Sequence, residues 1–217
     1  MKNRVYVIDT DHFIQARLYE KWHSAVPQWR REKADRFRFD KDKRLSLGAG
    51  AALEIALRDS GRSTADVTFS EHGKPELNGI CFNLSHSGHY AVCAVSDDTV
   101  GVDVEVMREF SPKLAKRVFT QQEISQAQQA YPGCDSNRIL TRLWTIKESI
   151  MKYYGQGISL SPESIVISPA SPITAACDAH DTSELHFTLF EVNSHLITVC
   201  SQKTDFELCE ISADKLI

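Results

Sequence analysis

The sequence has no long apolar run and no excess of basic charge, and both absences argue against broad classes of protein. The first apolar run, residues 5–8, ends at Asp9 and is far too short for a signal peptide or a membrane-spanning helix. The 25 Lys and Arg residues are outnumbered by 29 Asp and Glu residues, for a net charge of −4, whereas binding to nucleic acid or a membrane surface requires a basic face. We therefore predict a cytoplasmic protein with neither a nucleic acid nor a membrane as partner.

Two chemical motifs are also missing. The six cysteines form no Cys-x-x-Cys motif and no Cys/His cluster at zinc spacing, so we predict reduced thiols. No Gly-x-Ser-x-Gly motif is present, which argues against a hydrolase with a serine nucleophile at that turn. With 42% hydrophobic and 25% charged residues over 217 positions, the composition is that of a globular protein with one large domain or two small ones.

The order of the predicted elements suggests two similar halves, residues 1–99 and 100–217. In each half, helices precede antiparallel strands, which indicates the α+β class. We predict helices at 12–36, 42–59, 121–130 and 138–154, strands at 67–70, 80–84, 164–167, 185–192 and 196–201, a hairpin of 90–96 with 100–107, and a surface loop at 168–183.

The predicted strand at 100–106 carries two acids on one face. Side chains alternate along a strand, so the valines at even positions face one side, predicted to be the core, while Gly101, Asp103 and Glu105 share the other. A solvated strand face would show the same pattern. The pair also suits Mg²⁺, because Mg²⁺ takes one or two carboxylates and leaves its other positions to water and phosphate.

The helix at 138–154 presents a polar face opposite its core stripe. Trp144, Glu148 and Lys152 lie four residues apart on that face, with Lys147 at its flank. A solvated face with a Glu–Lys pair is one interpretation. A tryptophan there favours a covered face, on which a metal for Glu148 and a phosphate for Lys152 would supply the partners that buried charges need. The core stripe consists of Ile139, Leu143, Ile146, Ile150 and Tyr153.

A short basic segment lies in the first half. Residues 30–44 contain eight cations and four acids, a net charge of +4, which leaves −8 for the rest of the chain. This segment is either an ordinary charged helix surface or a site for a compact anion such as a nucleotide phosphate. The polar residues 82–89, which end a predicted strand, are likewise suited to present N–H and hydroxyl groups to a phosphate.

Taken together, these segments resemble the signature of the 4′-phosphopantetheinyl transferases of the Sfp type. The sequence GVDVE at 101–105 is followed some forty residues later by WTIKESIMK at 144–152. Further matching segments are 73–75, 83–88, 119–123 and 155–157, and the resemblance runs from about residue 28 to residue 160. The resemblance implies two α+β halves related by pseudo-twofold symmetry, in a monomeric enzyme.

The resemblance also implies an activity. Such an enzyme transfers the phosphopantetheine arm of coenzyme A to a serine of an apo acyl or peptidyl carrier protein and releases adenosine 3′,5′-bisphosphate. Mg²⁺ bound to the pyrophosphate is then held by Asp103, Glu105 and Glu148. The implied catalytic residues are Glu148 as base for the carrier serine, Lys152 at the leaving phosphate, and Asp103.

Coenzyme A is expected to contact both halves. By resemblance, Arg30, Lys33 and Arg44 bind its 3′-phosphate, and the stretch 107–119 docks the carrier protein. The remaining coenzyme A contacts implied by the resemblance are His72, Gly73, Lys74 and Pro75 at the adenine, and Ser85, His86, Asp103 and Lys152 at phosphate.

Two alternatives to the transferase remain. The first is a catalytically inactive module that binds coenzyme A or a carrier protein, and the second is a Mg²⁺-dependent phosphoester hydrolase. The acids favour an enzyme over a binding module, because a module that needs only affinity has no reason to hold Asp103, Glu105 and Glu148 around an anionic ligand.

Overall fold

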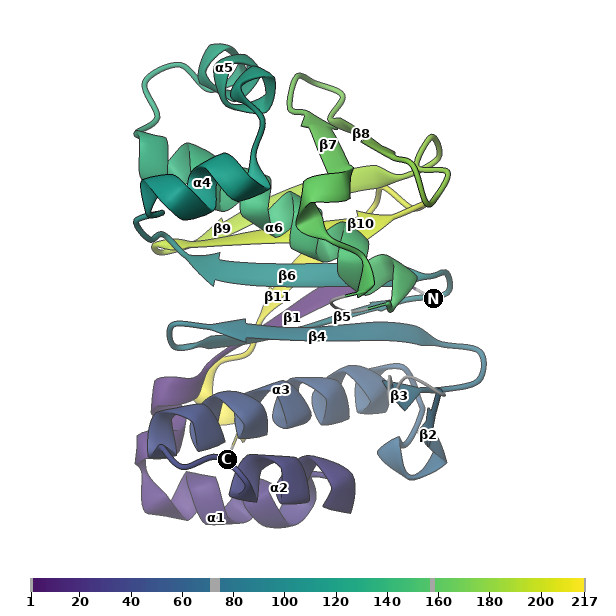
Figure 1. Cartoon of the computed structure of the whole chain (residues 1–217). Coiled ribbons are helices and arrows are strands. Elements are labelled where there is room, and N and C mark those ends of the chain that lie inside the picture. The colour runs from purple at the N-terminus through teal and green to yellow at the C-terminus, as the bar shows by residue number, and fades with distance from the viewer. Residues whose placement is uncertain (1, 71–74, 157–158, 217) are drawn as a thin grey trace. The chain divides into compact units, whose positions relative to one another are not determined.

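Groups of helices and groups of strands follow one another along the computed structural model, which describes residues 2–70, 75–156 and 159–216 (Figure 1). The chain divides into two units. The first consists of Met1–Asp97 and Asp205–Ile217, and the second of Asp98–Thr204. Each unit contains helices and a mainly antiparallel sheet, so the predicted α+β class is confirmed.

The first unit is built on a four-stranded sheet in the order β11-β1-β5-β4. Strands β1 (Arg4–Asp9), β5 (Tyr90–Ser96) and β4 (Cys81–Ser87) pair antiparallel. The apolar run at residues 5–8, too short to span a membrane, is the buried centre of β1. This strand is not among those predicted from the sequence.

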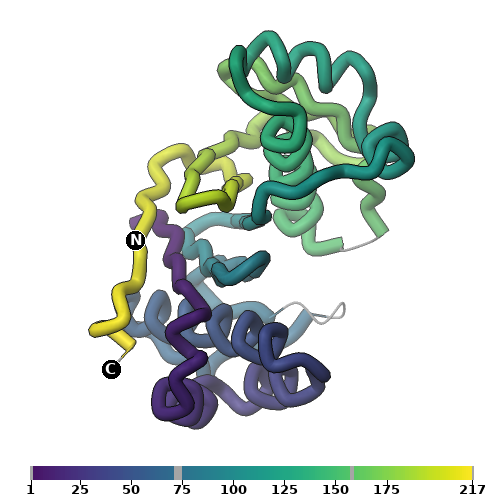
Figure 2. Tube along the Cα trace, turned by 90° about the vertical axis from the view of Figure 1, so that its left-hand side faces the viewer, coloured from purple at the N-terminus to yellow at the C-terminus, as the bar shows by residue number. Residues whose placement is uncertain are grey.

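The C-terminal segment belongs to this sheet, which corrects the predicted boundary between the halves. Strand β11 (Glu207–Glu210) pairs in parallel with β1, and the backbone N–H of Ile211 donates to the carbonyl of Val7 at 2.8 Å. Figure 2 shows this segment, in yellow, beside the purple N-terminal strand. Residues 205–216, assigned from sequence to the second half, therefore complete the first unit.

The helices of the first unit pack on the sheet through α3 (Asp40–Asp59), with α1 and α2 beyond it (Figure 1). Close packing is possible because Gly48 has no side chain: a β-carbon there would lie 2.5 Å from Cγ2 of Thr10. The predicted helix 12–36 is divided, and its last break falls at Pro27, which lacks the N–H that would continue the helix. Its parts are η1 (Thr10–Ile14), α1 (Ala16–Ala25) and α2 (Gln28–Asp35).

The predicted hairpin of 90–96 with 100–107 is wrong. Strand β5 pairs with β1 and β4, whereas β6 (Val100–Val106) pairs with β10 (His195–Ser201) in another sheet. The connection at 97–99 has the polar composition of a hairpin turn, but it leads from the first unit into the second. The pairing of strands depends on which side chains the whole sheet buries, and a local turn pattern does not indicate this.

The second unit has a three-stranded sheet in the order β6-β10-β9, on which α6 (Ser136–Tyr154) packs. Strands β9 (His186–Val192) and β10 form the predicted hairpin through Asn193, which has a positive φ of 51°. The predicted core stripe of α6 is confirmed over most of its length. Ile139, Leu143, Ile146 and Ile150 are buried, and Tyr153 is half-buried.

Gly101 determines which face of β6 the helix covers. A β-carbon at Gly101 would collide with the backbone oxygen of Ser149 and the backbone nitrogen of Tyr153. Helix α6 therefore packs on the face that carries Gly101 and Asp103. The prediction placed the core on the opposite, valine face, and those valines are buried at positions 100, 102 and 104 as well.

The remaining elements are short. In the part of the chain that the structure describes, no helix is both long and apolar enough to span a membrane. Strand β8 lies within the predicted loop 168–183. The bounds are η2 (Thr64–Asp66), β2 (Thr68–Phe69), β3 (Pro75–Glu76), α4 (Pro112–Val118), α5 (Gln121–Ala130), η4 (Pro162–Ser164), β7 (Ile165–Ser168), β8 (Thr174–Cys177) and α7 (Ala213–Leu216).

Candidate functional site

Asp103 and Lys152 form the centre of a charged site in the second unit. Asp103 lies in the middle of β6 and is 3% exposed, and Lys152 lies in the last turn of α6. The ammonium of Lys152 donates to Oδ1 of Asp103 at 2.6 Å. This contact requires α6 on the glycine face of β6, and it neutralises a carboxylate that would be costly to bury alone.

Glu148 lies one turn before Lys152 on α6 and is half-buried. Burial raises the pKa of its carboxyl group above the ordinary value, and the negative charges of Asp103 and Glu105 raise it further. The charges of Lys152 and Arg108 oppose that shift of the pKa. The three acids predicted from the sequence therefore act on one another electrostatically.

Arg108 is a neighbour of this site that the sequence analysis placed only in the docking stretch. Its guanidinium lies over the ring of Phe110 at 4.9 Å and over the ring of Trp144 at 5.5 Å. Cation–π contacts of this kind restrain a long, flexible side chain. Trp144, predicted to lie on a covered face, thus holds a cation whose charge acts on Glu148.

The donor set of the site is compatible with a divalent cation. Asp103, Glu105 and Glu148 are hard oxygen donors, and their mutual repulsion is the kind that Mg²⁺ relieves. Within the described ranges, no three His, Cys, Asp or Glu side chains are already arranged as a metal-binding group. In this structure, Lys152 supplies the positive charge next to Asp103.

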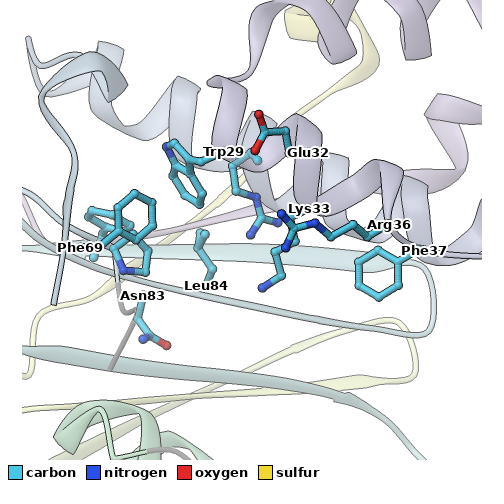
Figure 3. Close-up of a pocket in the computed structure, with 11 residues that line it drawn as sticks. Trp29, Glu32, Lys33, Arg36, Phe37, Phe69, Asn83 and Leu84 are labelled. Carbon is cyan, nitrogen blue, oxygen red and sulfur yellow. The ribbon is translucent and has the colours of Figure 1, made fainter. Parts of the chain in front are cut away.

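A separate cavity of about 650 Å³ lies within the first unit, between α2 and β4 (Figure 3). Lys33 and Arg36 extend into it from the end of α2, opposite Asn83 and Leu84 of β4. Its lining residues are Trp29, Arg30, Glu32, Lys33, Arg36, Phe37, Phe69, Pro75, Phe82, Asn83 and Leu84. Aromatic and cationic walls together suit a ligand that carries a ring and a phosphate.

Two buried donors lie in the wall of this cavity. Arg30 is 4% exposed and donates to the carbonyl of Ser46 at 2.5 Å and to its hydroxyl at 3.3 Å. Its Nε and the indole nitrogen of Trp29 are buried and have no hydrogen-bond partner among the described residues. Burial lowers the pKa of Arg30 to about 10, so it remains a cation at neutral pH. Arg30 therefore contributes positive charge to the wall of the cavity.

The predicted cations are only partly brought together. Arg30 and Lys33 share this cavity, and burial together with the charge of Arg30 lowers the pKa of Lys33. Arg44 lines a different cavity, of about 310 Å³, with Tyr19, Asp40 and Lys43. The larger cavity is therefore lined by Arg30 and Lys33 but not by Arg44.

The structure describes only some of the other residues predicted to contact coenzyme A. Pro75 lines the larger cavity, whereas His72, Gly73 and Lys74 lie outside the described residues. Ser85, which is buried, and His86, which is exposed, both belong to β4. Because side chains alternate, His86 lies on the same face as Leu84, which borders the cavity.

Sequence reasoning missed Trp29 and Arg36 as wall residues. Arg36 was counted within the basic segment, but neither its charge nor its spacing distinguished it from Arg38 or Arg44. Trp29 follows Pro27 at the start of α2, and nothing local indicates that its ring meets Phe69, at 5.3 Å edge to face. Both assignments depend on how α2, which packs on α3, lies across the cavity from β4.

Comparison with known proteins identifies the family. Residues 99–200 match the model of the 4′-phosphopantetheinyl transferase superfamily. A 4′-phosphopantetheinyl transferase of Bacillus subtilis is 30% identical over 211 residues, which cover 94% of each chain. The transferase Sfp of Bacillus subtilis strain 168 is 28% identical over 224 residues, 99% of this chain and 100% of that protein. HetI of Nostoc, another 4′-phosphopantetheinyl transferase, is 34% identical over 153 residues, 64% of each. The chain belongs to the 4′-phosphopantetheinyl transferase superfamily.

Proposed function

We propose that the protein transfers the 4′-phosphopantetheine moiety of coenzyme A to a serine of an apo acyl or peptidyl carrier protein, giving the holo carrier and adenosine 3′,5′-bisphosphate. The observation that carries the proposal is the Lys152–Asp103 contact next to Glu148, within the region that matches the family. We place this reaction in the cytoplasm, with the enzyme as a monomer.

The residues of the second unit would perform the chemistry. Asp103, Glu105 and Glu148 would hold Mg²⁺, which supplies positive charge to neutralise the pyrophosphate. Glu148 accepts the proton of the carrier serine, whose oxygen forms a bond to the phosphorus that carries the pantetheine. The bond from that phosphorus to the bisphosphate leaving group breaks, and Lys152 stabilises the charge that develops on it.

The first unit would hold the adenosine end of coenzyme A. Lys33 and Arg36 face the 3′-phosphate in the 650 Å³ cavity, and Arg30 forms its buried wall. By resemblance, Arg44 shares the 3′-phosphate, residues 72–75 hold the adenine, and Ser85 and His86 contact the pyrophosphate. The carrier protein docks on 107–119, where α4 carries exposed Lys113, Lys116 and Arg117.

One experiment separates this function from its alternatives. The protein is incubated with coenzyme A, Mg²⁺ and an apo carrier protein, and the mass of the carrier is measured. A transferase adds one phosphopantetheine to the carrier. An inactive binding module leaves the carrier and coenzyme A unchanged, and a phosphoester hydrolase cleaves coenzyme A without labelling the carrier.

A further inference from the structure

Glu123 and Lys147 form an ion pair in the interior of the second unit. Their side chains are 0% and 1% exposed, and Nζ of Lys147 lies 2.9 Å from Oε1 of Glu123. Glu123 is in the first turn of α5 and Lys147 is in α6. The proposed chemistry uses neither residue, although Lys147 immediately precedes Glu148.

Lys147 connects three further elements to α6. Its ammonium donates to the carbonyl of Val118, the last residue of α4, at 2.7 Å. It also donates to the carbonyl of Pro162, the first residue of η4, at 3.2 Å. A lysine has three donors, and these two carbonyls and Glu123 match that number. One side chain of α6 thus joins the end of α4, the start of α5 and η4.

Glu123 also makes hydrogen bonds to the backbone of two neighbouring segments. Its Oε2 accepts the backbone N–H of Thr120 at 2.7 Å, and the hydroxyl of Thr120 accepts the N–H of Glu123 at 3.1 Å, which is the capping box of α5. Its Oε1 also accepts the backbone N–H of Ile167, in β7, at 2.9 Å. The carboxylate therefore fixes the start of α5 to both α6 and β7.

Stability alone is a weak reason for such a pair. Removing two charges from water costs free energy that their attraction only partly returns, and well-packed apolar residues of similar volume often stabilise a protein as well or better. The pair does define direction and distance, because its two charged groups make directed hydrogen bonds to the backbone of Val118, Thr120, Pro162 and Ile167. Val118 and Thr120, which it holds, flank the turn between α4 and α5.

We propose that Glu123 and Lys147 are a positioning pair that holds α4 and α5 in one place relative to α6, and so sets the distance between the carrier-docking surface and Glu148. This inference rests on the proposed function, in which α4 receives the carrier. The pair acts through neighbouring elements and does not touch a substrate.

The test uses the double variant Glu123→Gln/Lys147→Met, which removes both charges and leaves no lone buried ion. We expect it to fold, and to lower kcat/KM for the carrier protein about 10- to 100-fold because the serine is no longer presented correctly to Glu148. Its affinity for coenzyme A should stay within about twofold of wild type. Amide hydrogen exchange should accelerate over 118–130 and remain unchanged over 139–150.

Thr145→Val is the matched control. It removes a buried hydrogen bond of α6, between the hydroxyls of Thr145 and Thr198 at 2.8 Å, without touching α4 or α5. We expect it to lower the melting temperature but leave the carrier KM unchanged. Glu123→Gln/Lys147→Leu, which likewise leaves no lone buried ion, provides a second variant should the first fail to fold, and the same exchange pattern is expected of it.

Two results would overturn the inference. One is a folded double variant with wild-type carrier kinetics, and the other is unchanged exchange over 118–130 in both variants. Either would show that the pair only stabilises the fold. Failure of the wild-type protein to label any carrier would instead refute the proposed function, while the exchange experiment would still decide whether the pair holds α4 and α5.

Discussion

The ammonium of Lys152 lies 2.6 Å from a carboxylate oxygen of Asp103, which is 3% exposed. A strand residue and a residue in the last turn of a helix thus balance each other's charge at the site that we assign to the pyrophosphate of coenzyme A. In the ligand-free protein, Lys152 stabilises the buried acid, and during transfer it is expected to face the phosphate.

Lys152→Met should affect both roles. The loss of the ion pair should lower the free energy of unfolding by about 1–2 kcal/mol, because Asp103 stays buried without its cation while Lys152 itself is partly exposed. Transfer should slow by about 10²–10³ as a donor to the leaving phosphate is lost. Thermal melts and the rate of carrier labelling measure the two effects.

The double variant Asp103→Asn/Lys152→Met separates these roles. With no charge left to bury, it should recover most of the lost stability but none of the activity. Recovery of transfer in the double variant would show that neither the Lys152 ammonium nor the Asp103 carboxylate is needed for transfer.

Gly101→Ala should disrupt the second unit. A β-carbon would collide with the backbone of Ser149 and Tyr153, and backbone atoms of a packed helix cannot move aside without losing core contacts, so we expect a loss of about 3 kcal/mol of stability. Gly50→Ala is the matched control. Its β-carbon would meet Cγ1 of Val26 at 3.1 Å, a side-chain methyl group and not a backbone atom, and alanine gains about 1 kcal/mol of helix propensity. Equal melting temperatures for the two variants would refute this packing argument.

The position of the 3′-phosphate can be tested with two ligands. Lys33→Ala, Arg36→Ala and Arg44→Ala should each weaken binding of coenzyme A more than binding of 3′-dephospho-coenzyme A. Lys33 and Arg36 share the larger cavity and Arg44 lines another, so we expect losses of about tenfold for the first two and a smaller loss for Arg44. Calorimetry gives the eight affinities, those of the wild-type protein and the three variants for each of the two ligands. Equal losses for both ligands in all variants would place the 3′-phosphate elsewhere.

Charge reversal on α4 tests the docking surface. Lys116 is exposed, and Arg117 contacts Glu163 at 2.5 Å on the surface, so Lys116→Glu should remove attraction to an acidic carrier without loss of stability. We expect the carrier KM to rise about tenfold and the affinity for coenzyme A to stay unchanged. Lys203→Glu, which changes charge equally but lies outside 107–119, is the control. An unchanged carrier KM in Lys116→Glu would move docking to another surface.

Much of the site could be predicted from the sequence because it depends on local periodicity. The four-residue spacing of Trp144, Glu148 and Lys152 and the two-residue spacing of Asp103 and Glu105 determine which side chains share a face. The fold class and the apolar core stripe of α6 could be predicted from the same helical and strand periodicities.

The errors concern contacts between distant segments. The polar connection at 97–99 looked like a hairpin turn, but the partners of β5 and β6 are β1 and β10, far away in the sequence. Likewise, Lys147 was predicted to lie at the flank of a polar face. Its partner Glu123 is 24 positions earlier in the sequence, and no local pattern indicates that the two side chains pair in the interior. Burial of a charge depends on such partners and is decided only by the packed structure.

The role of Glu148 is the centre of the account, and the labelling rate of the carrier at increasing Mg²⁺ concentration tests it most directly. Asp103→Asn and Glu105→Gln should be partly rescued by high Mg²⁺ or by Mn²⁺, because ligation is their assigned role. Glu148→Gln cannot accept the serine proton, so it should remain about 10²–10⁴-fold slower than wild type at saturating metal. Full rescue of Glu148→Gln by metal would contradict the account, because it would show that Glu148 is a metal ligand only and that another group removes the proton.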